Sequence, residues 1–236
     1  TVTVAGRTDS GVHAIGQVAA FRTNSTIPIQ KFRRGLQTFL PEDIAVVDAI
    51  EVHDEFHATY WAIKKRYRYI MYDGPVLMPF LRRYVVDLSG RRLDLSAMQH
   101  AAAHLLGTHD FRCFESHFPN KATSVRTILD AVVERTSRWP GWMPVPLEHS
   151  RVQLSDGGPI ASVGFDNDFV ILEVEADGFL YNMVRTIAGS LMKIGLGQWE
   201  PDRMQSIIEG MDRSQAGHTA PACGLYLVSV DYRDHP

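Results

Sequence analysis

Residues 169–176, Phe-Val-Ile-Leu-Glu-Val-Glu-Ala, constrain the fold more than any other segment, because their side chains alternate in polarity. Val170, Leu172, Val174 and Ala176 fall on one face of an extended chain and are expected to point inward, whereas Glu173 and Glu175 fall on the other face and are expected to point outward. An apolar stripe at helical spacing follows in residues 179–195, and Gly195 ends it. A strand with one apolar face, followed by an amphipathic helix, predicts a helix packed on a β-sheet.

Similar local patterns predict the other elements. We expect strands at residues 1–5, 17–23, 44–50, 66–72, 125–134 and 224–232, and helices at 28–41, 93–107 and 201–211. This pattern indicates an α+β protein with two similar α/β halves, in which mainly antiparallel sheets are flanked by helices. We place the halves at residues 1–58 and 59–236, although no sequence repeat proves that they are duplicates. Residues 137–160 are rich in proline and tryptophan and form an expected insertion in the second half.

Composition limits the classes of protein to which the chain can belong. It has 236 residues, 45% hydrophobic and 22% charged, which is typical of a globular protein with a sizeable core. The two cysteines lie far apart and form no Cys-x-x-Cys pattern, and no apolar run approaches the length of a membrane span. We therefore expect a cytoplasmic protein without a membrane partner. Because the net charge is -3, a nucleic-acid partner would need a local basic patch.

The loop that follows the first predicted strand carries the most concentrated functional chemistry. Gly6-Arg7-Thr8-Asp9-Ser10-Gly11 is rich in turn formers, and a carboxylate, a guanidinium and the imidazole of His13 lie within seven residues. An aspartate in such a stretch often only caps a turn. The Gly-x4-Gly spacing is also that of a phosphate loop, but Val12 and His13 stand where lysine and serine or threonine are required. We therefore exclude a phosphate loop and keep Asp9 as a candidate functional residue.

The sharpest basic patch lies on the predicted strand 66–72 and the residues before it. Four cations lie next to aromatic side chains or alternate with them there: Lys64, Lys65, Arg66 and Arg68. Tyr67 shares one face with Tyr69, and the arginines lie on the opposite face. Such a strand can hold a phosphate backbone and stack an unpaired base, but an amphipathic strand with ordinary aromatic packing explains the pattern equally well.

Histidines also have the spacing of paired metal ligands at one place. His100 and His104 stand four residues apart on the predicted helix 93–107. Surface histidines explain such a pair more often than a metal site does, so we expect neither a metal nor a cofactor.

The loop and several further segments resemble the tRNA pseudouridine synthase A family of bacteria. Ala5-Gly6-Arg7-Thr8-Asp9-Ser10-Gly11-Val12-His13-Ala14 resembles the family's signature loop. Further motifs follow in order across nearly the whole chain: Leu40-Pro41-Glu42-Asp43-Ile44, Lys65-Arg66-Tyr67-Arg68-Tyr69, Gly107-Thr108-His109-Asp110-Phe111, Phe179-Leu180-Tyr181-Asn182-Met183-Val184-Arg185 and Thr219-Ala220-Pro221-Ala222-Cys223-Gly224-Leu225.

The resemblance implies an isomerase that converts uridine to pseudouridine in the anticodon stem-loop of tRNA, at positions 38, 39 and 40, with the active-site cleft between the two halves. Asp9 matches the family's catalytic aspartate, Tyr67 the tyrosine that stacks on the target base, and Arg185 the arginine that pairs with the aspartate. A guanidinium in that place stabilises the ionised carboxylate that the chemistry needs. A homodimer that binds one tRNA across both subunits is also implied. The remaining candidate substrate-binding residues are Arg7, Thr8, Gly11, Val12, His13, Lys64, Lys65, Arg66 and Arg68.

This sequence departs from the family pattern in two places, and two other functions are considered beside the one that the resemblance implies. The family's first strand would lie upstream of Thr1, so we expect residues before it, and residues 137–160 are longer than the compact bacterial pattern. A non-catalytic RNA-binding module would need the basic strand but not Asp9. A histidine-dependent metal hydrolase would lose its activity with a chelator.

Overall fold

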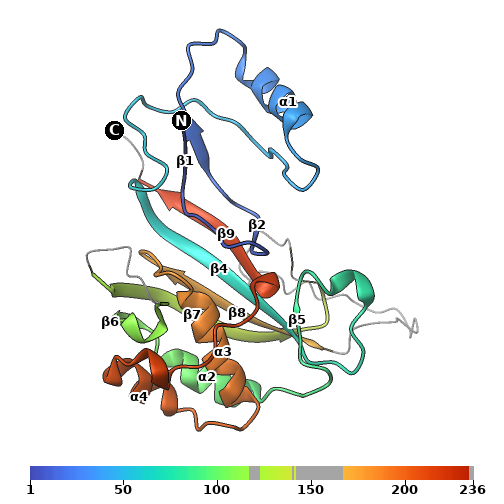
Figure 1. The fold of residues 1–236 in the computed structure, drawn as a ribbon, viewed down its shortest axis with the longest axis vertical. Coiled ribbons are helices and arrows are strands. Elements are labelled where there is room, and N and C mark those ends of the chain that lie inside the picture. The colour runs from blue at the N-terminus through green and yellow to red at the C-terminus, as the bar shows by residue number, and fades with distance from the viewer. Residues whose placement is uncertain (117–122, 140, 142–166, 234–236) are drawn as a thin grey trace, which may run out of the picture. The chain divides into compact units, whose positions relative to one another are not determined.

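The structure is a computed structural model that describes residues 1–116, 123–139, 141 and 167–233 (Figure 1). Most of the expected insertion at 137–160 lies outside the described residues. The chain groups into two compact units, Thr1–Gly6 with Val18–Trp61 and Arg7–Gln17 with Ala62–Pro236. The loop that carries Asp9 is thus grouped with the second unit, whereas the sequence analysis placed it in the half at 1–58. The similarity of two halves stays a prediction.

The first unit contains a two-stranded antiparallel sheet and one helix. Strand β1 (Val2–Val4) pairs with β3 (Ala19–Phe21), and helix α1 (Ile29–Phe39) begins directly after Pro28. Proline suits this place because its fixed φ angle and missing N–H fit the start of a helix. These three elements confirm the expected strands at 1–5 and 17–23 and the helix at 28–41.

The strand expected at residues 44–50 is wrong, because these residues form no strand in the described structure. Side chains of α1 bond the main-chain groups that a neighbouring strand would otherwise bond. Gln37 donates to the carbonyl of Ile44 at 2.7 Å and accepts from the N–H of Val46 at 2.8 Å, and Arg33 donates to the carbonyl of Val47 at 2.9 Å. Apolar composition alone could not distinguish this arrangement from a strand.

The second unit is built on a mainly antiparallel sheet. Its order is β2 (His13–Ala14), β9 (Leu225–Tyr232), β4 (Ala62–Tyr72), β8 (Phe169–Ala176), β7 (Val125–Thr136) and β6 (Gly107–Asp110), with β5 (Val86–Asp87) paired to β4. Among the strand pairs of this sheet that the structure describes, only β2·β9 and β4·β5 are parallel. The expected α+β class is therefore confirmed.

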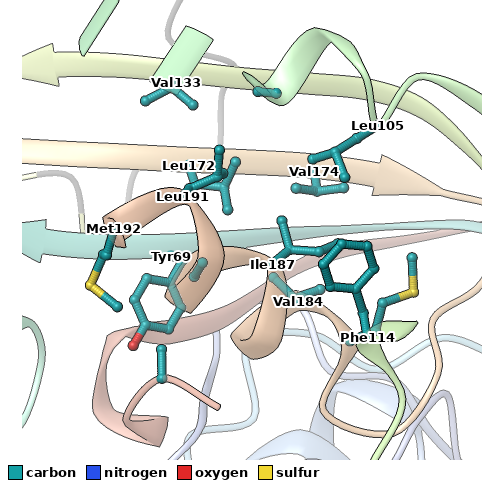
Figure 2. Packing of buried hydrophobic residues seen from close by; sticks show 14 of the residues in the cluster. Tyr69, Leu105, Phe114, Val133, Leu172, Val174, Val184, Ile187, Leu191 and Met192 are labelled. Carbon is teal, nitrogen blue, oxygen red and sulfur yellow. The ribbon is translucent and has the colours of Figure 1, made fainter. Parts of the chain in front are cut away.

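Helices α2 (Leu95–Ala103), α3 (Met183–Gly195) and α4 (Arg203–Gly210) lie together on one side of this sheet (Figure 1). Figure 2 shows Ile187 and Leu191 of α3 among Leu172 and Val174 of β8, and all four side chains are fully buried. The aliphatic face of residues 169–176 joins this core as predicted. The outward placement expected for Glu173 and Glu175 is wrong, because both side chains are buried against the cations of β4. Short 3-10 turns complete the unit at Pro79–Leu81, Arg112–Phe114, Arg213–Gln215 and Ala222–Gly224.

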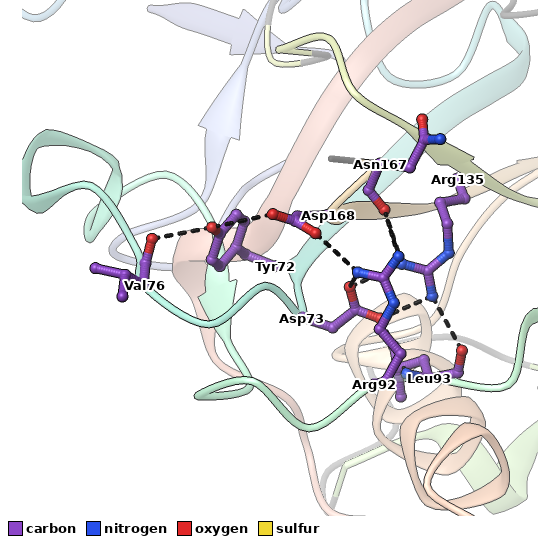
Figure 3. Close-up of polar contacts among 8 residues, drawn as sticks. All are labelled: Tyr72, Asp73, Val76, Arg92, Leu93, Arg135, Asn167 and Asp168. Atoms are coloured by element: carbon purple, nitrogen blue, oxygen red, sulfur yellow. Dashed lines mark hydrogen bonds and ion pairs between the residues drawn. The ribbon is translucent and has the colours of Figure 1, made fainter. Parts of the chain in front are cut away.

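A buried carboxylate ties the end of β4 to β7 and to the start of α2 (Figure 3). The side chain of Asp73 is fully buried and accepts from Arg135 at 2.7 Å, from Arg92 at 3.1 Å and from the backbone N–H of Leu93 at 2.9 Å. Arg92 also donates to Asp168 at 2.8 Å. A buried charge is tolerated when it is paired and hydrogen-bonded in this way.

Buried tyrosines make the folded protein sensitive to alkali. Burial raises the pKa of Tyr67 to about 12, and it raises the pKa values of Tyr69 and Tyr226 as well. As pH rises from about 10 towards 12, the unfolded chain loses protons that the folded chain keeps, so stability falls. We expect a loss of about 1 kcal/mol per pH unit for each such tyrosine.

Urea unfolding across this pH range measures the slope. Tyr67→Phe removes one of the groups while keeping the ring, so its stability should depend less steeply on pH than that of the parent chain. Equal slopes for the two proteins would contradict the assignment to Tyr67.

Within the residues that the structure describes, none of the helices has both the length and the apolar composition needed to cross a membrane.

Candidate active site

The loop at residues 7–17 is held against the edge of the large sheet. Strand β2 places His13 opposite Tyr226 and Ala14 opposite Leu227 of β9. Before it, the N–H of Val12 bonds to the carbonyl of Asp9 at 3.0 Å, and Gly11 has a φ angle of 83°, a value that glycine adopts without strain. The turn residues of the sequence therefore fix the loop on which Asp9 lies.

His13 anchors this loop through its ring. The imidazole stacks on Tyr84 and Tyr226, with ring centroids 5.1 and 4.7 Å apart, and its Nε2 lies 2.8 Å from the carbonyl oxygen of Arg83. These contacts position the loop through His13. From the sequence, His13 was predicted only as a candidate substrate-binding residue.

The first turn of α3 presents Arg185 to Asp9. One guanidinium nitrogen of Arg185 donates to Oδ2 of Asp9 at 2.7 Å and to Oδ1 of Asn182 at 2.9 Å. Its Nε donates to the carbonyl of Ala220 at 2.7 Å. Asn182 precedes the helix with a φ angle of 62°, in the left-handed region that asparagine tolerates better than most residues. Three acceptors thus fix the guanidinium in one orientation.

The carbonyl of Ala220 reaches Arg185 because the segment before it lies directly on α3. A Cβ atom at Gly189 would collide with the main-chain oxygen of His218, so glycine is required for this approach. The backbone N–H of Gly217 donates to Ser190 at 2.9 Å, and that of Ala220 donates to the carbonyl of Arg185 at 3.1 Å. The arginine is consequently held from both its main chain and its side chain.

Tyr67 lies on β4 in the core next to this ion pair. It is 9% exposed, and its ring meets Phe179 edge-on with centroids 4.9 Å apart. Burial is the larger cause of its raised pKa of about 12, and the charge of Asp9 is the second. The hydroxyl therefore stays protonated at neutral pH and lies within the electric field of the carboxylate.

The structure thus brings Asp9, Arg185 and Tyr67 together within the second unit. Of the other loop candidates, Arg7, Thr8 and Gly11 are exposed, and Val12 packs against the core.

The basic strand differs from the expectation of a free phosphate track, because Lys64, Arg66 and Arg68 form ion pairs. Arg68 is fully buried and donates to Glu173 at 2.7 Å, and Lys64 lies 3.0 Å from Glu175. Arg66 contacts several carboxylates: Asp130 at 3.0 Å, Glu173 at 3.1 Å and Glu175 at 3.1 Å. These pairs argue against phosphate binding by Lys64, Arg66 and Arg68.

Asn182 and the carbonyl of Ala220 both bind Arg185, although neither was predicted as a site group from the sequence. Asn182 could have been found from its place three residues before Arg185 at the start of a helix, where side chains at this spacing are neighbours. No local sequence pattern predicts that the main-chain carbonyl of Ala220 binds Arg185.

The fold and this site define an α+β protein in which a loop aspartate is paired with a helix arginine beside a buried tyrosine. The family profile described as tRNA pseudouridine synthase matches residues 1–61 and 101–233. The chain belongs to this family.

Individual relatives are similar in sequence to this chain over nearly its full length. It is 40% identical over 228 residues to tRNA pseudouridine synthase A of Thermoanaerobacter sp., and 43% identical over 228 residues to that of Acetivibrio thermocellus. Both matches cover 97% of this chain and 81% of the relative. It is also 41% identical over 231 residues to tRNA pseudouridine synthase A of Shouchella clausii, covering 98% of this chain and 77% of the relative.

Proposed function

We propose that the protein isomerises uridine to pseudouridine in the anticodon stem-loop of tRNA, at positions 38, 39 and 40, with Asp9 as the catalytic carboxylate. Membership of the tRNA pseudouridine synthase family supports the reaction, and the names of the relatives support tRNA as the substrate. The observation that carries the assignment of the site is the 2.7 Å contact between Asp9 and Arg185, two residues that are 176 positions apart in the chain.

The reaction exchanges one bond of the nucleoside for another. The N1–C1′ glycosidic bond breaks, the uracil turns, and C5 bonds to C1′, while C5 loses a proton and N1 gains one. Attack of Asp9 at C1′, attack at C6 and removal of a sugar proton all begin from an ionised carboxylate. Arg185 donates a charge-assisted hydrogen bond to this carboxylate, and its three fixed contacts leave little freedom for the pair to move.

The target base must leave its stack before the carboxylate can reach it, which costs a few kcal/mol. We propose that Tyr67 offsets part of this cost by stacking on the base, and that the loop residues Arg7, Thr8, Gly11, Val12 and His13 shape the substrate site. Lys65 is our candidate for phosphate contact, because it lies in the basic segment that the sequence predicts. A homodimer in the cytoplasm completes the proposal.

Incubation with tRNA that is radiolabelled in its uridines tests the reaction directly. We expect pseudouridine with a tRNA that carries uridines at 38–40, none when all three are replaced by cytidine, and no effect of EDTA. Binding without conversion would favour a non-catalytic RNA-binding module. Loss of activity with EDTA while the chain stays folded would favour a metal-dependent reaction.

Substitutions of Tyr67 separate its ring from its hydroxyl. Tyr67→Phe keeps the ring, so tRNA affinity should survive and any loss of rate measures proton transfer by the hydroxyl. Tyr67→Leu should weaken binding by about 1–3 kcal/mol, because stacking is lost. Single-turnover kinetics and tRNA-binding titrations measure the two effects, and equal losses for both variants would contradict a stacking role.

A further inference from the structure

Two histidines and one aspartate converge between α2 and α4, away from any role in the site described above. His100 lies on α2, His104 follows at the end of that helix, and Asp202 directly precedes α4. Nε2 of His100 lies 3.3 Å from Oδ1 of Asp202, and Nε2 of His104 lies 3.4 Å from the same oxygen. One ligand atom from each residue lies within 4.8 Å of the other two.

These distances fit a tetrahedral zinc ion. With bonds of about 2.0–2.1 Å to nitrogen and oxygen, neighbouring ligand atoms of a tetrahedron are about 3.3–3.4 Å apart. The two nitrogen–oxygen distances already have this length. The side-chain chemistry fits as well, since imidazole and carboxylate are ordinary zinc ligands.

The local hydrogen bonding leaves these atoms available to an ion. In the part of the chain that the structure describes, Nε2 of His104 is a buried atom without a hydrogen-bond partner. An unsatisfied buried group costs about 1–3 kcal/mol. Asp202 occupies the N-cap position of α4, where aspartate commonly accepts a bond from the helix backbone, but its side chain makes no such bond. Both side chains are directed to one point instead.

Ion pairs between the histidines and Asp202 explain the geometry less well. The two imidazole rings are stacked, with centroids 5.5 Å apart, and two charged imidazoles at this separation repel each other while sharing one carboxylate. One divalent cation between neutral imidazoles avoids this repulsion.

We propose that His100, His104 and Asp202 bind one divalent transition-metal ion of the zinc class, with water as the fourth ligand. The side chain of Asp202 is 76% exposed, so solvent can reach the open position. The ion connects two helices whose ligands are 98–102 positions apart in the chain, and it stabilises the fold without taking part in the isomerisation.

Titration of the metal-free full chain with Zn²⁺ and with Co²⁺ tests the site. We expect one ion per chain, visible Co²⁺ absorption typical of four-coordination, and a rise in the unfolding midpoint of about 5–10 °C when Zn²⁺ exceeds its Kd about 100-fold. Absence of binding at micromolar Zn²⁺ would overturn the proposal.

Variants locate the bound ion. His104→Gln and Asp202→Asn should each weaken Zn²⁺ binding by roughly tenfold or more, because each removes a ligand. His53→Gln removes an exposed histidine from the other compact unit and should bind as the parent chain does. Asp202→Asn keeps an exposed N-cap residue and remains informative if His104→Gln fails to fold. Unchanged affinity in Asp202→Asn and a folded His104→Gln would place the ion elsewhere and reject the site.

Discussion

Asp9→Asn is expected to lower the rate of pseudouridine formation by roughly 10⁴-fold or more while leaving tRNA affinity within a few-fold of the parent chain. The substitution replaces one carboxylate oxygen by an amide nitrogen and so removes the charge while keeping the shape. Arg185 retains its bonds to Asn182 and Ala220, so the helix start should stay in place. Single-turnover conversion of labelled tRNA measures the rate, and a binding titration measures the affinity.

A matched control separates catalysis from the loss of a surface charge. Asp231 forms an exposed pair with Lys64 at 3.2 Å, and Asp231→Asn makes the same chemical change outside the site. We expect this control to keep nearly full activity. Comparable rates for the two asparagine variants would remove Asp9 from the catalytic role.

Glu173→Leu is expected to destabilise the fold by about 3–5 kcal/mol, the second large effect. The carboxylate is 4% exposed and bonds to Arg68, whose side chain is 1% exposed, and to Arg66. Its removal takes the paired anion from a buried guanidinium. The double variant Arg68→Met/Glu173→Leu should lose much less stability than the sum of the two single variants. Replacing both members of a buried ion pair by apolar residues often leaves stability unchanged.

Urea unfolding of the parent, both single variants and the double variant gives the coupling energy directly. Lys64→Met is the control on the same strand. Lys64 is 34% exposed in its pair with Glu175, so its loss should cost about 1 kcal/mol or less. A Glu173→Leu variant no less stable than this control would contradict the buried pair.

The buried pairs also show why the basic strand was interpreted as a phosphate track. The spacing of Lys64, Arg66 and Arg68 with the tyrosines is the same whether the cations face RNA or carboxylates. Their partners Glu173 and Glu175 lie more than 100 positions later in the chain, and the β4·β8 register places Arg68 opposite Glu173 and Arg66 opposite Glu175. Strand register is set by the assembled sheet and its core, which the local pattern of one strand does not contain.

Local periodicity in the sequence was enough to predict several elements. The aliphatic face of β8, the amphipathic stripe of α3 and the turn around Asp9 follow from side-chain alternation and from glycine, as the structure confirms. Hydrophobic periodicity is enough here because each of these features depends on residues at most a few positions apart.

Contacts between groups far apart in the chain depend on how the elements pack. The resemblance to a family implied that Asp9 pairs with Arg185, but the contact itself depends on α3, on the close approach allowed by Gly189 and on the carbonyl of Ala220. The third candidate ligand beside the two α2 histidines, Asp202, likewise appears only when α4 packs near α2. Burial and pairing are properties of the assembled chain, because a side chain's partner is set by packing between elements and not by its own sequence neighbours.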